Sequence, residues 1–229
     1  MVLEEYHKVV LDIFKHKDEI KYYVITKNFN NFLCNINGQL TKYGENDAKD
    51  LLLYLLQMMH EELNYFGDQK LKNIPKCNKL IEAESFNYFM TMNSNLNLSV
   101  ISYLFYGILK SKTICKGCKK IIYDFQYFKI LSFPTYNFKD SIFNINQGFK
   151  EFTKPKLMND DNKYYCKYCK GFREAEVTTK IYYPPPYLII NIDYDKNKKY
   201  KPRKVNLEVE LILKILQMNL INYLTFNIN

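Results

Sequence analysis

Cys115-Lys116-Gly117-Cys118 and Cys166-Lys167-Tyr168-Cys169 are two Cys-x-x-Cys pairs separated by residues 119–165, and the fold is expected to be organised around them. Each pair fits a short turn that directs both sulfurs to one point, and two such turns supply the four thiolates that tetrahedral Zn²⁺ prefers. We therefore predict a zinc site with Cys115, Cys118, Cys166 and Cys169 as ligands. Because protein fills all four positions, the metal would stabilise the fold and leave no place for a catalytic water.

Other uses of the paired cysteines remain open at this point. They could be packed thiols without a metal, disulfides in an oxidising compartment, or a redox pair, although a redox Cys-x-x-Cys normally occurs alone at the start of a helix. The chain begins Met1-Val2-Leu3-Glu4-Glu5, without the basic and apolar segments of a secretory signal. Its longest apolar run, Leu51 to Leu56, is far too short to cross a bilayer. These features favour a reducing compartment, the cytoplasm or the nucleus, with no membrane partner.

Composition indicates a globular protein, since 47% of the 229 residues are hydrophobic and 16% are aromatic. The formal net charge of +9, from 33 basic and 24 acidic residues, could point to nucleic acid. The basic residues are spread along the chain, however, and the densest group, in 196–204, resembles a hairpin tip. Such a run is more typical of a solvated loop than of a phosphate-binding surface. Nucleic acid is therefore not expected as a partner, and a zinc-ribbon nucleic-acid binder stays as the minor alternative.

Hydrophobic periodicity predicts two helices in the first half of the chain. Residues 3–16 have apolar side chains at helical spacing and form an amphipathic pattern. A clearer stripe runs from Ala48 to Leu63, and Asn46 or Asp47 can cap its start while Gly67 can end it.

The segments around these helices have weaker patterns. Residues 22–44 are predicted as strand or loop, and residues 68–98 as a linker. The remaining cysteines and the histidines stand alone in the sequence, so we interpret them as structural or surface residues: Cys34, Cys77, His7, His16 and His60.

The second half of the chain has a β pattern. Alternating and apolar runs predict strands at residues 100–109, 121–131, 174–182 and 187–192, with a short helix at 142–152. The two strands that flank the first Cys pair should form a metal-bearing hairpin. One helical half and one β half indicate an α+β architecture.

Three motifs together resemble the catalytic domain of ubiquitin-specific proteases, the cysteine peptidases that cleave ubiquitin from proteins. The first is Glu45-Asn46-Asp47-Ala48-Lys49-Asp50 with His60-Glu61-Glu62-Leu63-Asn64, which resembles the family's Gln-Gln-Asp-Ala-x-Glu helix and its Leu-His-Glu-Glu-Leu-Asn ending. The second is the region from Ser99 through both Cys pairs, which resembles the zinc-tipped fingers. The third, from Ile181 to Val205, resembles the palm strand that follows.

The resemblance implies a papain-like hand with a helical thumb, a β palm and zinc-tipped β fingers that hold ubiquitin, here in truncated form. Residues 1–98 would form the thumb-like part, and residues 99–229 the fingers and palm. The resemblance also implies that Asp47 contacts the tail of ubiquitin, with Asp50 as the weaker candidate. Two carboxylates at a helix start can pair with that basic tail, although Asp47 as a helix cap alone explains its position equally well.

The family's catalytic boxes have no match in these 229 residues. The nucleophile belongs to a Gly-Asn-Thr-Cys-Tyr box and the base to a Gly-His-Tyr segment, whereas no histidine follows His60 here. A thiolate nucleophile needs a nearby base, so no catalytic residue is assigned. The resemblance therefore implies deubiquitination as the family activity and ubiquitin as the partner, with the chain as given expected to be inactive. A non-catalytic ubiquitin-binding scaffold is the alternative.

Overall fold

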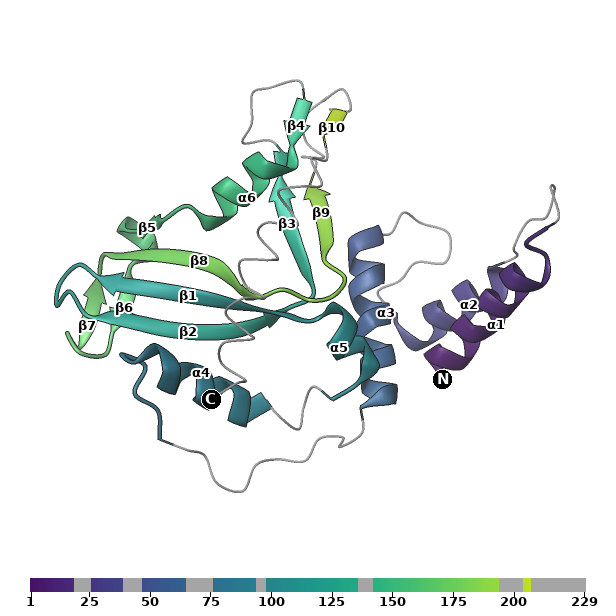
Figure 1. Cartoon of the computed structure of the whole chain (residues 1–229), viewed down its shortest axis with the longest axis horizontal. Coiled ribbons are helices and arrows are strands. Elements are labelled where there is room, and N and C mark those ends of the chain that lie inside the picture. The colour runs from purple at the N-terminus through teal and green to yellow at the C-terminus, as the bar shows by residue number, and fades with distance from the viewer. Residues whose placement is uncertain are drawn as a thin grey trace, which may run out of the picture. The chain divides into compact units, whose positions relative to one another are not determined.

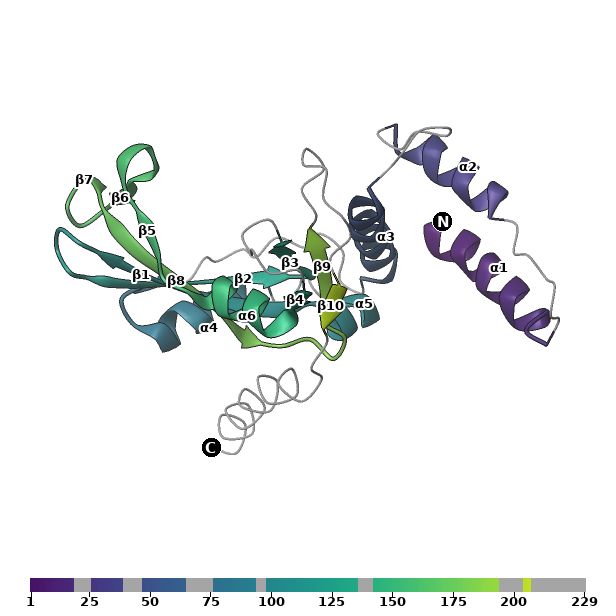
Figure 2. The ribbon, with the colours of Figure 1, turned by 90° about the horizontal axis from the view of Figure 1, so that it is seen from above.

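A computed structural model of the chain describes residues 1–18, 26–38, 47–64, 76–93, 98–135, 142–193 and 204–206. Helices α1 to α5 precede the first strand, and strands β1 to β10 with helix α6 follow (Figure 1, Figure 2). This mixture of helices and sheets confirms the predicted α+β class. Contacts divide the chain into two compact units: Met1–Gln69 with Asn95–Ser102, and Lys70–Ser94 with Tyr103–Asn229.

The first unit contains α1 (Val2–Lys15), α2 (Lys27–Ile36) and α3 (Ala48–Leu63). The predicted helices at 3–16 and 48–63 are both confirmed. Helix α3 begins where the sequence places its cap, because Asp47 Oδ1 accepts a hydrogen bond from the Lys49 N–H at 2.9 Å. It ends at Leu63, with Asn64 as its C-cap.

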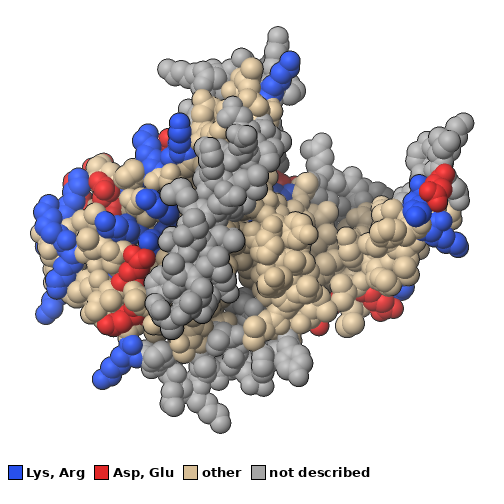
Figure 3. Space-filling view, viewed as in Figure 1, with Lys and Arg blue, Asp and Glu red and all other residues tan. Residues whose placement is uncertain are grey.

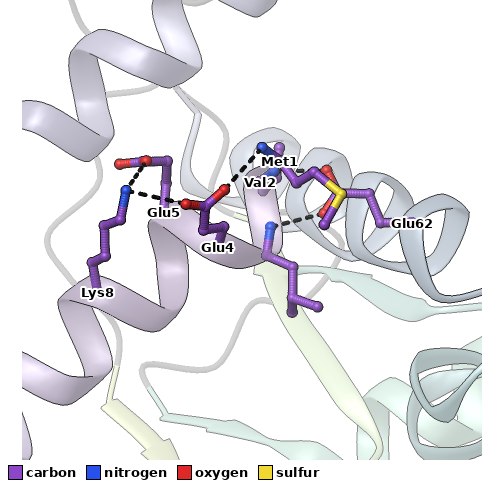
Figure 4. Close-up of polar contacts among 7 residues, drawn as sticks. Met1, Val2, Glu4, Glu5, Lys8 and Glu62 are labelled. Carbon is purple, nitrogen blue, oxygen red and sulfur yellow. Dashed lines mark hydrogen bonds and ion pairs between the residues drawn. The ribbon is translucent and has the colours of Figure 1, made fainter.

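Glu62 of α3 fixes the start of α1 (Figure 4). Its two carboxylate oxygens accept hydrogen bonds from the N–H groups of Val2, at 2.6 Å, and Leu3, at 2.9 Å. The first N–H groups of a helix have no partner within the helix, and a negative charge there also complements the helix dipole. One carboxylate therefore holds these two helices together, although the two segments lie far apart in sequence.

Three predicted segments have a different structure. Residues 22–44 contain α2, because Phe29, Phe32 and Leu33 recur at helical spacing between asparagines, and Leu33 is buried. The presumed linker 68–98 contains α4 (Glu82–Asn93). Residues 100–109 begin as helix α5 (Val100–Phe105), and the strand starts only at Gly107.

Strands of the second unit form one four-stranded sheet and three two-stranded sheets. The four-stranded sheet has the order β2-β1-β8-β5 and is antiparallel throughout. The parallel pairs are β3–β9 and β4–β10, and β6–β7 is an antiparallel hairpin. The element bounds are β1 (Gly107–Cys115), β2 (Ile121–Phe128), β3 (Ile130–Pro134), β4 (Ile142–Asn144), α6 (Ile145–Thr153), β5 (Lys156–Met158), the 3-10 helix η2 (Asp160–Asn162), β6 (Tyr164–Cys166), β7 (Gly171–Arg173), β8 (Ala175–Tyr183), β9 (Ile189–Asp193) and β10 (Lys204–Asn206). The predicted strands at 121–131, 174–182 and 187–192 are confirmed. The short helix predicted at 142–152 is also present, but it begins at Ile145, because residues 142–144 form β4.

Side chains alternate along β2, so its two faces serve different neighbours. Phe125 and Tyr127 contact α4, where the Phe86 ring lies 5.2 Å from that of Phe125 and the Phe89 ring 4.8 Å from that of Tyr127. This aromatic packing explains why a segment with a weak helical pattern folds as a helix.

Phe128 projects from the other face of β2 into the main hydrophobic core. That core joins the sheet to β3, β4 and α6 through Leu109, Phe128, Leu131, Phe133, Phe143, Ile145, Phe149 and Ile181. The four-stranded sheet is thus anchored in the core at one end and carries the first Cys pair at the other, whereas the second pair belongs to the β6–β7 hairpin.

Several predictions concern residues that the structure does not describe, including Asn46, Gly67, most of the basic run 196–204 and the final residues. Among the helices that the structure describes, none combines the length and the apolar composition needed to cross a membrane.

Candidate functional site

Two turns of matching geometry carry the four cysteines. The first turn connects β1 to β2, with the Lys119 N–H donating to the Cys115 carbonyl at 2.9 Å. The second connects β6 to β7 as the tip of a short hairpin. In each turn the lysine after the second cysteine has a left-handed backbone, with φ of 59° at Lys119 and 51° at Lys170. That conformation is costly for a side chain other than glycine, so a stable structure must enforce it at both places.

The turns bring all four sulfurs together, within 4.8 Å of one another. Across the two turns, Cys115 Sγ lies 3.9 Å from Cys169 Sγ, and Cys118 Sγ lies 3.7 Å from Cys166 Sγ. Four sulfurs placed at about 2.3 Å from a tetrahedral Zn²⁺ lie about 3.8 Å apart, whereas a disulfide requires about 2.05 Å. The four cysteines can therefore hold a metal ion, as the sequence predicted, and they are free thiols.

Burial and hydrogen bonding shift the pKa values of two of these thiols in opposite directions. Cys115 and Cys166 are fully buried. Burial opposes the thiolate of Cys166, but the backbone N–H groups of Cys169 and Tyr168 and the neighbouring thiols donate to it, and the net effect lowers the pKa of Cys166 to about 7. Burial and contacts with the other cysteines raise the pKa of Cys169 to about 12. Four thiols in one cluster lose their protons in sequence, and a bound cation would drive the later steps.

Residues around the cluster tie the two turns to each other. The Lys116 N–H donates to the Glu174 carbonyl at 2.9 Å, and its ammonium lies 3.8 Å from the Glu174 carboxylate. Lys120 Nζ lies 4.1 Å from the centre of the Tyr168 ring, and so the first turn reaches over the second. Space is tight at Gly117, because an added Cβ would lie 3.3 Å from Cys169 Sγ and the neighbours would have to shift by a few tenths of an ångström. The sequence pattern alone did not predict these contacts.

Asp47 and Asp50 lie at the start of α3, in the first unit. Both are exposed, and Asp50 has Lys49 Nζ at 3.5 Å. Asp47 caps the helix as described, so its structural role is established by the geometry. Two exposed carboxylates at this helix start present negative charge to solvent, which suits a basic partner.

The isolated cysteines and histidines contact other groups. Cys34 Sγ donates to Asn30 Oδ1 at 3.7 Å, and Cys77 Sγ to the Glu84 carbonyl at 3.9 Å. His60 is buried, and its Nδ1 lies 2.7 Å from Ser99 Oγ. Ser99 also accepts a hydrogen bond from the Ser102 N–H at 3.0 Å, which caps α5. His60 therefore acts as a structural residue, as predicted, and it holds the start of α5 against α3.

Comparison with known proteins identifies the family of the chain. The model of the ubiquitin carboxyl-terminal hydrolase family matches residues 2–228. A probable ubiquitin carboxyl-terminal hydrolase 4 of Schizosaccharomyces pombe is 26% identical over 196 residues, which cover 82% of this chain and 33% of that protein. Ubiquitin carboxyl-terminal hydrolase 5 of Saccharomyces cerevisiae is 28% identical over 189 residues, 78% of this chain and 23% of that protein.

A shorter match involves ubiquitin carboxyl-terminal hydrolase 32 of Drosophila melanogaster, which is 35% identical over 95 residues, 40% of this chain and 5% of that protein. The chain thus spans a third or less of the length of these relatives. The family match itself extends over almost every residue and confirms the resemblance in the sequence motifs. The chain belongs to the ubiquitin carboxyl-terminal hydrolase family.

Proposed function

We propose that this chain binds ubiquitin and serves in the thiol-dependent removal of ubiquitin from proteins. The observation that carries the proposal is the family match over residues 2–228, combined with four converging thiols at the end of a β sheet. In this assignment residues 1–98 are the thumb-like part, and residues 99–229 are the fingers and palm. A reducing compartment, the cytoplasm or the nucleus, suits six free thiols.

The ion at Cys115, Cys118, Cys166 and Cys169 is proposed to be Zn²⁺. A compact set of four thiolates suits a soft or borderline divalent ion, and the spacing of the sulfurs fits the Zn–S bond length. With four protein ligands the metal stabilises the fingers and takes no part in bond cleavage.

Asp47 and Asp50 are proposed to contact the basic tail of ubiquitin. Each carboxylate is exposed, so each contact would be weak on its own and sensitive to salt. The two roles of Asp47 are compatible, because the cap uses the hydrogen bond from the Lys49 N–H to Oδ1 while the side chain remains exposed to solvent.

Cleavage needs a thiolate that attacks the carbonyl carbon at the C-terminal glycine of ubiquitin and a histidine that takes up and returns the proton. The amine then leaves, and water hydrolyses the acyl-enzyme. Cys34 and Cys77 contact an asparagine side chain and a backbone carbonyl, which do not act as bases for this step. We therefore expect the 229 residues alone to bind ubiquitin without turnover.

The test is a titration of the zinc-loaded chain with ubiquitin by isothermal calorimetry. Asp47→Asn removes the charge but keeps a good helix cap, so it should weaken binding several-fold and leave thermal stability unchanged. Asp18→Asn, an exposed carboxylate that follows α1, is the matched control. Ubiquitin without its C-terminal tail should bind the parent and Asp47→Asn equally well. Absence of ubiquitin binding by the folded, zinc-loaded chain would overturn the proposal.

Catalysis is tested separately with ubiquitin linked at its C-terminus to a fluorophore. The chain should release no fluorophore above the rate seen after alkylation of its thiols. Release that depends on Cys34 or Cys77 would contradict the assignment of these residues.

A further inference from the structure

The end of the second unit that carries the cysteine turns is strongly basic. We call residues 115–120 and 160–174 the fingertip. Its basic side chains are all exposed: Lys116, Lys119, Lys120, Lys163, Lys167, Lys170 and Arg173. Three acidic residues, Asp160, Asp161 and Glu174, leave a net charge of +4. Figure 3 shows Lys and Arg side chains gathered over this end of the second unit. Residues that are scattered in the sequence therefore form one patch in the fold.

Most of these cations are not neutralised by neighbouring carboxylates. Within the described residues, Lys116 is the fingertip cation that has a carboxylate within 4 Å, that of Glu174. Lys120 and Lys167 lie over the Tyr168 ring at 4.1 and 5.2 Å, which leaves their charge in place. A divalent ion with four thiolates would contribute −2 at the centre, so the fingertip would keep a charge of +2. The cysteine sulfurs lie inside and the ammonium groups outside, and an approaching anion meets the ammonium groups first.

Two large aromatic rings are exposed at the same place. Tyr165 of β6 and Phe172 of β7 are register partners, with ring centres 5.4 Å apart and an interplanar angle of 77°. Their exposed fractions are 56% and 64%, although paired rings of this size are usually buried. Alternation along β6 directs Cys166 toward the opposite face, the side of the four sulfurs, and the exposed Lys163 directly precedes this strand. The rings thus form a platform with cations beside it.

We propose that the fingertip binds single-stranded nucleic acid, with Tyr165 and Phe172 stacking on bases and the surrounding lysines contacting phosphates. This combination of exposed rings and adjacent cations is the one that single strands need, because every base has a flat π-face and each nucleotide carries a phosphate. An acidic polypeptide would satisfy the charge equally well. Its carboxylate side chains offer no flat surface for the two rings, and so nucleic acid uses more of the observed features.

The experiment measures fluorescence anisotropy of labelled oligothymidylate with the full zinc-loaded chain. If about three phosphates are contacted, the slope of log affinity against log salt should be about −2, and affinity should fall roughly 20-fold between 50 and 200 mM salt. Lys163→Gln should make this slope shallower by about 0.7, whereas Lys150→Gln, an exposed lysine of α6, should leave it unchanged.

The aromatic contribution is tested with the Tyr165→Ala/Phe172→Ala double variant. It should lower affinity about tenfold with the salt slope retained, and Tyr103→Ala, a more exposed ring on α5, should have no effect. Zinc content and circular dichroism of each variant must match the parent, which excludes misfolding. Lack of binding by the parent at 50 mM salt would overturn the proposal. Equal affinity of the parent and the double variant, with polyglutamate displacing the oligonucleotide, would overturn it in favour of an acidic protein partner.

Discussion

Gly107→Ala tests whether the base of the four-stranded sheet is as tightly packed as the structure shows. Gly107 begins β1, opposite Phe128 of β2 and beside the end of β8. A Cβ at this position would lie 2.4 Å from the Phe128 ring and 2.7 Å from the carbonyl oxygen of Tyr183. Ordinary contacts begin at 3.4 Å, so the ring would have to move by about 1.0 Å and the carbonyl by about 0.7 Å. Neither group can move freely, since one is in the core and the other is backbone.

Two opposing contributions to the free energy of unfolding determine whether Gly107→Ala destabilises the protein. Overpacking of this kind costs about 1–3 kcal/mol, and a carbonyl contact favours the upper half of that range. Alanine restricts the unfolded chain more than glycine does, which returns about 0.4–1 kcal/mol. The net destabilisation should be about 2 kcal/mol, a large share of the roughly 5–15 kcal/mol that stabilises a typical domain.

Thermal unfolding followed by circular dichroism measures this loss on the full chain. For about 2 kcal/mol, Tm should fall by roughly 4–8 °C in a chain of this size. Gly38→Ala is the matched control, because an added Cβ there has no atom within 4 Å, and its Tm should rise by about 1–4 °C from the restriction of the unfolded chain alone. If Gly107→Ala unfolded at the same temperature as Gly38→Ala, the packing described at the base of the sheet would be wrong.

Three further predictions concern the metal centre and the first unit. Cys115→Ser should abolish stoichiometric zinc binding, measured by release to a chromogenic chelator, because three remaining thiols leave an open coordination site. Glu62→Gln should lower Tm by several degrees, since two helix-start N–H groups lose a charged acceptor, whereas Glu61→Gln should change it less; equal shifts would contradict the role of Glu62. Zinc affinity, measured by competition with a chelator, should fall as pH drops below about 7. The pKa of Cys166 is lowered to about 7 and that of Cys169 is raised to about 12, so zinc must displace protons from the cluster even at neutral pH. As pH falls, it must displace protons from more of the thiols, which weakens binding. A zinc affinity that does not change with pH would contradict this reasoning.

The cluster of four cysteines could be predicted from the sequence more completely than the helices of the chain. The Cys-x-x-Cys spacing places both sulfurs of a pair on one short turn, so the convergence of the four sulfurs could be predicted without knowledge of the fold. Helix α3 was also predictable, because its apolar stripe and its Asp47 cap agree. Local signals and tertiary packing favour the same conformation at both places.

The missed helices show where local signals fail. In α5, Val100 and Ile101 favour a strand, but Ser99 caps the turn and so the backbone begins as a helix. In α4 the weak pattern is stabilised by Phe86 and Phe89, which contact strands that come later in the chain. Tertiary contacts of this kind cannot be counted from local periodicity. The same reason explains the fingertip charge, because lysines spaced widely in sequence meet only after the two turns have converged.

The metal centre matters most to the shortest strands. Strands β6 and β7 have three residues each, and an isolated hairpin of this length has little stability in water. Joining the two turns closes the loop formed by residues 119–165, which costs about 3 kcal/mol of chain entropy. Binding of zinc to four thiolates provides roughly 10–16 kcal/mol in small zinc domains, so the ion outweighs this cost with a large surplus. The exposed rings and lysines of the fingertip therefore depend on the metal, whereas Asp47 on α3 does not. Chelation should separate the two proposed binding functions: nucleic acid should be released, while the contact at the start of α3 keeps its geometry.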